Sequence, residues 1–151
     1  MNQYEYILIS ALNSSSPSNS WDSWLVDSGA THHFFGYKEF LSNLVERESN
    51  LKIILGDNYN HPIKGFGSAK FHLDSGESVL LHVVMYVLGL KKNLVSISVL
   101  EDKRMRVAFI KGKVLTWPVG SPMKDTLGLR YEGLYRVTGR PLLALVHNLI
   151  I

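Results

Sequence analysis

One short stretch of the chain places a carboxylate where it could work in acid–base catalysis. Asp27 follows the apolar residues 24–26, and Ser28, Gly29 and Thr31 come shortly after it. An apolar strand would deliver the carboxylate to a tight loop, and Gly29 lets other backbone approach that loop because it lacks a Cβ atom. The hydroxyls of Ser28 and Thr31 can donate hydrogen bonds that hold the loop rigid. We therefore expect Asp27 to be catalytic and the other three residues to support its loop.

A second Asp-Ser-Gly tripeptide, which begins at Asp74, serves as an internal comparison. It follows a segment in which polar and apolar residues alternate, and Glu77 comes directly after its glycine. This pattern is typical of a solvated hairpin turn. The two tripeptides also lie too close in the sequence to form a catalytic pair within one chain, because each would need a lobe with its own sheet. We therefore expect Asp74 to be structural.

Peptide hydrolysis by carboxylates needs two of them in contact. Two like charges so close cannot both ionise, so the pair shares one proton. One carboxylate then activates water while the other protonates the peptide oxygen. Because the chain offers only Asp27, the second carboxylate has to come from another copy of the chain, related by a two-fold axis.

Strand signals dominate the elements that would position Asp27, which predicts a mainly β protein. Strands are expected to lead into Asp27 and to follow it, and a long strand over residues 63–73 carries two glycines that suggest a bulge or a close approach of backbone. A hairpin is expected around Lys111-Gly112, and a last short strand over residues 133–137. Residues 118–128 are expected to form a loop.

Composition excludes several kinds of site. The 151 residues contain no cysteine, so disulfides, thiol catalysis and cysteine-bound zinc are excluded. His32 and His33 are adjacent and would point to opposite faces of a strand, so we expect no metal and no cofactor. The apolar run 79–90 is too short to cross a bilayer. The net charge is +3, and the basic clusters at 91–92 and 103–106 are more typical of solvated faces than of a nucleic-acid site.

Several segments, taken in order, resemble the protease of copia-type LTR retrotransposon Gag-Pol polyproteins, a relative of the retroviral proteases. Residues 24–33 resemble the active-site block of that family, and residues 54–58 with 63–67 resemble its flap and the strand that follows. Residues 84–100 resemble its most recognisable block. Residues 133–137 are similar to the linker that runs toward the integrase.

The resemblance implies a retropepsin-like closed β-barrel lobe, one per chain, that pairs as a two-fold homodimer. Gly56, Asp57 and Asn58 would contact the substrate backbone from the flap. Ser96 stands where retroviral relatives carry glycine, a departure that is usual for copia-type chains. Leu88 stands where the family usually has proline. The loss of proline loosens a turn but removes no catalytic atom.

These observations divide the chain into three parts: a flexible linker over residues 1–20, a retropepsin-like protease domain over 21–105, and a hairpin and linker over 106–151. The expected function is that of an aspartic endopeptidase acting on a polypeptide substrate, the polyprotein, without a membrane partner. The expected location is the cytoplasm or virus-like particles. The alternative is a catalytically inactive retrotransposon remnant that serves as a β-rich dimerisation or binding module.

Overall fold

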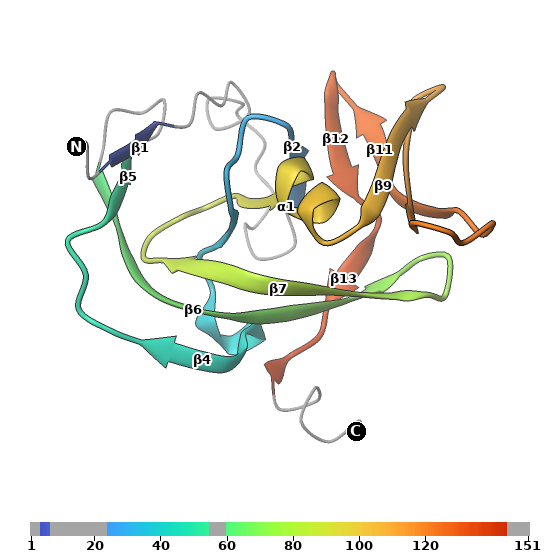
Figure 1. Cartoon of the computed structure of the whole chain (residues 1–151). Helices are drawn as coiled ribbons and strands as arrows, with labels where there is room; N and C mark the ends of the chain where they lie inside the picture. The colour runs from blue at the N-terminus through green and yellow to red at the C-terminus, as the bar shows by residue number, and fades with distance from the viewer. Residues whose placement is uncertain (1–3, 7–23, 55–59, 145–151) are drawn as a thin grey trace.

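The structure is a computed structural model that describes residues 4–6, 24–54 and 60–144. Strands dominate these residues, as expected, together with one short 3-10 turn, Lys38–Phe40, and one short α-helix (Figure 1). The strands and the helix are, in chain order, β1 (Tyr4–Tyr6), β2 (Trp24–Asp27), β3 (His33–Phe35), β4 (Ser42–Glu46), β5 (Lys52–Ile54), β6 (Asn60–Leu73), β7 (Ser78–Val87), β8 (Asn93–Ser96), α1 (Ile97–Asp102), β9 (Met105–Ile110), β10 (Lys113–Pro118), β11 (Asp125–Tyr131), β12 (Leu134–Val137) and β13 (Gly139–Pro141).

The described strands form one open path rather than a closed barrel. Their order is β1-β5-β6-β7-β3-β8-β2-β12-β11-β10-β9, with β4 and β13 paired to β6 beside the path. The two end strands, β1 and β9, are not neighbours in this order, so the closure expected from the sequence is not present. The strands β9 to β12, which follow α1, are added to the outer edge of β2 and extend the sheet instead of closing it, whereas β13 pairs with β6.

The long hairpin of β6 and β7 curves across the lower part of the molecule, with β4 below it (Figure 1). Its register shifts twice, once beside Gly65 and once beside Gly67, which confirms the expected irregularity. A Cβ atom on Gly65 would collide with the carbonyl of Val45 on β4, so the glycine is needed for the close approach of two strands. Asp74 is exposed in the turn between β6 and β7, where Gly76 has a φ of +97°. The second tripeptide is therefore a surface turn, as predicted.

Two apolar cores lie on opposite sides of the central strands β2, β3 and β8. Alternate residues of a strand point to opposite faces, so Trp24 enters one core and Leu25 the other. The Trp24 ring meets Phe35 and Phe71 edge to face, with centroids 4.2 and 4.4 Å away. Phe34 and Leu25 both belong to the second core and lie on either side of Leu94. Asp27 therefore ends a strand that is anchored on both faces.

The segment after α1 continues the same sheet. The hairpin around Lys111-Gly112 and the strand β12 are confirmed. The loop expected over residues 118–128 is wrong from Asp125 onward, because β11 begins there and pairs with both β10 and β12. Gly128 lies in that strand. A side chain at this position is excluded, because its Cβ atom would collide with the carbonyl of Arg136 on β12.

The proposed division of the chain stays a prediction. Most of the expected N-terminal linker lies outside the described residues, apart from β1, which pairs in parallel with β5. Across the expected boundary between residues 105 and 106, β12 pairs with β2 and β13 pairs with β6. The two sides of that boundary thus share one sheet.

Candidate active site around Asp27

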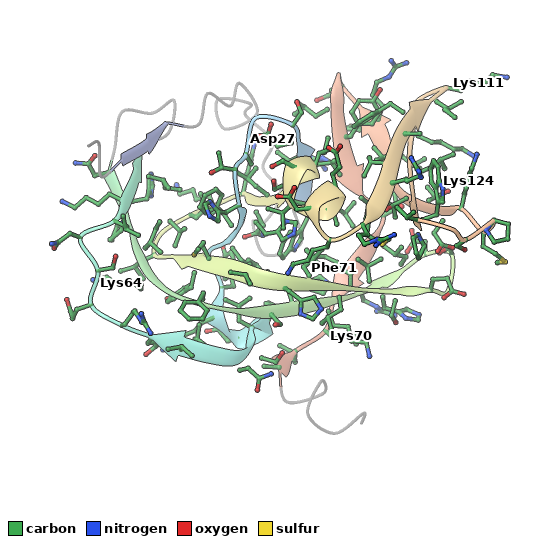
Figure 2. All side chains as sticks on the ribbon, in the orientation of Figure 1. Asp27, Lys64, Lys70, Phe71, Lys111 and Lys124 are labelled. Atoms are coloured by element: carbon green, nitrogen blue, oxygen red, sulfur yellow. The ribbon has the colours of Figure 1, made fainter. Side chains whose placement is uncertain are left out.

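Asp27 is the last residue of β2 and is half-buried, and the turn 28–29 follows it directly. Figure 2 shows its side chain beside the loop near α1, away from the labelled lysines of β6, Lys64 and Lys70. Two strands flank β2. They are β8, which runs parallel with Ser96 opposite Asp27, and β12, which runs antiparallel with Arg136 opposite Leu25. The carboxylate is therefore positioned by an interior strand of the sheet rather than by an edge.

The two oxygens of the Asp27 carboxylate have different surroundings. The backbone N–H of Gly29 donates a hydrogen bond of 2.7 Å to Oδ1. Oδ2 is buried and has no hydrogen-bond partner among the described residues. A Cβ atom on Gly29 would lie 3.3 Å from Oδ1, a tight contact, which explains the glycine at this position. A buried acceptor without a donor is costly, so Oδ2 is the oxygen that is left to accept a hydrogen bond from a group outside the described residues.

Ser96 holds the loop that follows Asp27 through its side-chain hydrogen bonds. Its Oγ donates a hydrogen bond of 2.6 Å to the carbonyl of Ala30, and it accepts one of 3.2 Å from the N–H of Val99. The second bond caps the N-terminus of α1, a role for which serine is well suited. One buried side chain therefore connects the loop after Asp27, the parallel strand and the helix. The sequence analysis considered Ser96 only as a substitute for glycine, and a serine directly before the helical residues 97–102 was the signal for this cap.

His33 is a second support that the sequence did not reveal. Its ring is buried, and Nδ1 accepts a hydrogen bond of 2.8 Å from the N–H of Ser96, so the proton of the neutral ring is on Nε2. Burial, and to a smaller extent the nearby His32, lower the pKa of His33 from 6.5 to about 4. The neutral ring is thus a fixed acceptor beside the candidate site. Its partner is 63 residues away in the sequence, so no local pattern indicates the contact.

The remaining predicted site residues are placed as follows. Ser28 and Gly29 form the exposed turn, and Thr31 is exposed with its Oγ1 3.0 Å from His32 Nδ1. The role of Ser28 and Thr31 as loop supports stays a prediction. The flap residues Gly56, Asp57 and Asn58 lie outside the described residues.

Two further findings limit the chemistry of the described residues. No group of three or more His, Asp or Glu side chains within them is arranged to hold a metal ion. No helix within them has the length and apolar character needed to span a membrane.

Comparisons with known proteins agree with the strand pattern. Residues 24–105 match the family described as the Pol polyprotein, beta-barrel domain. The chain is also similar to the retrovirus-related Pol polyprotein from transposon RE2 of Arabidopsis thaliana, with 26% identity over 162 aligned residues. That alignment covers 89% of this chain but 11% of the relative, so the chain spans about a tenth of the relative's length. No solved structure matches the chain. The family match covers more than half of the chain, which therefore belongs to the family of Pol polyprotein β-barrel domains.

Proposed function

We propose that this chain is the aspartic endopeptidase of a copia-type retrotransposon polyprotein and that Asp27 supplies its carboxylate. The observation that carries the proposal is the state of this side chain, with Oδ1 held by the Gly29 N–H and Oδ2 buried without a partner. A side chain that served only to cap a turn would not need a second buried oxygen. The similarity to a transposon Pol polyprotein supports the same reading.

The proposed reaction needs two copies of the chain. In each copy, β2 and the Ser96 contacts hold Asp27 at the start of its loop. Two such loops facing each other would place one Oδ2 against the other, and the pair would share a proton. The ionised carboxylate accepts a proton from water as the water attacks the peptide carbonyl, and the protonated one donates to the carbonyl oxygen. The substrate would be an extended polypeptide of the polyprotein, including the flanks of this chain.

The decisive experiment compares two Asp→Asn variants. Wild-type protein, Asp27→Asn and Asp74→Asn are incubated with a labelled, unfolded protein substrate at pH 5 and 6, and the cleavage products are identified by mass spectrometry. We expect Asp27→Asn to lower the cleavage rate by about 100-fold or more, because the variant cannot take up or release the shared proton. Asp74 is exposed in a turn, so Asp74→Asn should cleave at the wild-type rate. Equal rates for all three proteins would refute the proposal.

The alternative function is a β-rich dimerisation or binding module without catalysis. The description of the matched family supports it, since it names a barrel and no activity. Sedimentation of the purified chain, run beside the cleavage assay, separates the two. A dimer that cleaves the substrate supports the endopeptidase, whereas a stable dimer that cleaves nothing at either pH supports the module.

A further inference from the structure

The charges of the chain are divided sharply along its length. Residues 103–151 contain nine Lys and Arg but only two Asp and Glu, a net charge of +7. Residues 1–102 contain seven Lys and Arg against eleven Asp and Glu, a net charge of −4. The modest total of +3 therefore hides a strongly basic segment, which includes the strands β9 to β12.

The register of β9 to β12 gathers much of this charge on one face of the sheet. Residues that lie opposite one another in antiparallel strands share a face, and one such row consists of Ile110, Lys113, Leu129 and Arg136. Arg106 and Trp117 are also paired, and each is four residues from a member of that row, so they lie on the same face. We call this the outer face.

The opposite face of the same strands packs on the protein. Val114, Leu127 and Val137 are buried in the core that contains Trp24. Of the two acids in this segment, Asp125 lies opposite Thr116, which is buried, and Glu132 lies in the turn between β11 and β12. Neither acid belongs to the rows of the outer face, which is therefore basic without compensating carboxylates from its own strands.

Two aromatic rings on the outer face have cations beside them. The Lys124 ammonium lies 4.8 Å from the centre of the Trp117 ring, and the Arg136 guanidinium lies 5.2 Å from that of Tyr131. Tyr131 is 57% exposed, which is unusual for a large ring. Figure 2 shows Lys124 and Lys111 on the β9–β12 side of the molecule, apart from Lys64 and Lys70 on β6.

A crowding of positive charge accompanies this face. Burial lowers the pKa of Lys92, and the charge of Arg136 lowers it further. The two cations are therefore close enough for their charges to interact.

We propose that the outer face of β9 to β12 binds single-stranded nucleic acid. Exposed aromatic rings stack on bases, and Lys and Arg around them contact the phosphates. The outer face carries four cations (Arg106, Lys113, Lys124 and the half-buried Arg136) beside the rings of Trp117 and Tyr131. These groups supply both interactions, whereas a surface for acidic peptides would need the cations but not the rings. Duplex nucleic acid keeps its bases stacked inside, so its binding would leave Tyr131 and Trp117 unused. The proposal does not depend on Asp27 or on catalysis.

The test measures binding of a labelled 20-nucleotide RNA, and of DNA of the same sequence, to the full chain by fluorescence anisotropy at several salt concentrations. Each phosphate contact on a single strand contributes about −0.7 to the slope of log K against log salt, so the four cations predict a slope of about −3. Arg106→Glu with Lys113→Glu should roughly halve that slope and weaken binding more than about 10-fold at low salt. The matched control, Lys64→Glu with Lys70→Glu on β6, changes the net charge equally and should weaken binding less than about 3-fold.

The aromatic contribution is tested with Tyr131→Ala, which should weaken binding about 5-fold or more through lost stacking. The control is Phe109→Ala, a ring of the same sheet that is 45% exposed but lies opposite Val114, on the other face. Circular dichroism and urea midpoints establish that each variant is folded. Asp27→Asn should bind as the wild type does, so failure of the catalytic proposal would leave this result unchanged.

Several results would each overturn the inference. Four concern the binding measurements: the absence of binding at low salt, equal weakening by the two charge variants, wild-type affinity in Tyr131→Ala, and tighter binding of a 20-base-pair duplex than of the single strand. A decaglutamate peptide that displaces RNA at a similar concentration would also overturn it, since charge alone would then explain the surface. Tighter binding of RNA than of DNA, or the reverse, identifies which single strand the face prefers.

Discussion

Acidification should weaken the fold through one buried side chain, His33. Its pKa is about 4 in the folded protein against 6.5 for an unperturbed histidine. At a pH between these two pKa values, His33 is protonated in the unfolded chain but neutral in the folded protein. The free energy of unfolding therefore falls as the pH falls. The contribution is fully present above about pH 6.5 and is lost by about pH 4. At 1.36 kcal/mol per pH unit, the loss is about 3 kcal/mol.

The loss of stability arises at the hydrogen bond between His33 and Ser96. His33 Nδ1 accepts the Ser96 N–H, so a proton on that nitrogen would remove the acceptor and place a charge among buried residues. The charge of the neighbouring His32 adds to the cost. Acid should therefore loosen the strand that lies parallel to β2, opposite Asp27.

The assay is urea unfolding followed by tryptophan fluorescence at pH 7, 6, 5 and 4. In His33→Gln, the amide oxygen can still accept the Ser96 N–H but does not titrate. The control His72→Gln removes an exposed histidine of β6. Wild type and His72→Gln should lose about 3 kcal/mol more between pH 7 and pH 4 than His33→Gln loses. Parallel stability curves for all three proteins would refute the reasoning.

Three further substitutions test the supports of the candidate site. Ser96→Ala removes the cap of α1 and leaves a loop carbonyl unpaired, so it should lower the free energy of unfolding by about 1–3 kcal/mol, whereas Ser75→Ala in an exposed turn should change it by less than about 0.5 kcal/mol. Gly36→Ala would push a Cβ atom into the carbonyl of Leu90 and should cost about 1–3 kcal/mol in the same urea assay. Gly29→Ala would press on the Asp27 carboxylate and should slow cleavage about 10-fold or more, with a thermal midpoint that moves little. Unchanged cleavage in that last variant would mean that the loop geometry is not limiting.

Local signals were sufficient to predict the elements around Asp27. The apolar lead-in predicts β2, the glycine-rich alternation predicts β6, and the Lys111-Gly112 turn predicts the hairpin of β9 and β10. Each of these signals lies within a few residues of the feature that it predicts. The contrast between Asp27 and the exposed turn at Asp74 could also be read from the residues on either side.

What the sequence did not show depends on pairing between distant segments. The first residues of β11, 125–128, were expected to belong to a loop, whereas Gly128 lies in the strand and lets the backbone of Arg136 approach. Ser96 contacts Ala30 and His33 across more than 60 residues. The outer face is equally hidden, since its cations and rings come from separate strands and meet only through the register.

The position of β2 inside an open sheet restricts how two copies of the chain can meet. Four interstrand steps separate β2 from the edge strand β9, and each step is about 4.8 Å. Two copies joined edge to edge through β9 would hold their Asp27 side chains about 40 Å apart, while a shared proton needs them within hydrogen-bond distance. Dimerisation through the sheet edge and formation of a carboxylate pair thus exclude each other. A molecular mass does not distinguish these two kinds of dimer, but the distance between spin labels on the Asp27 loops of the two copies does.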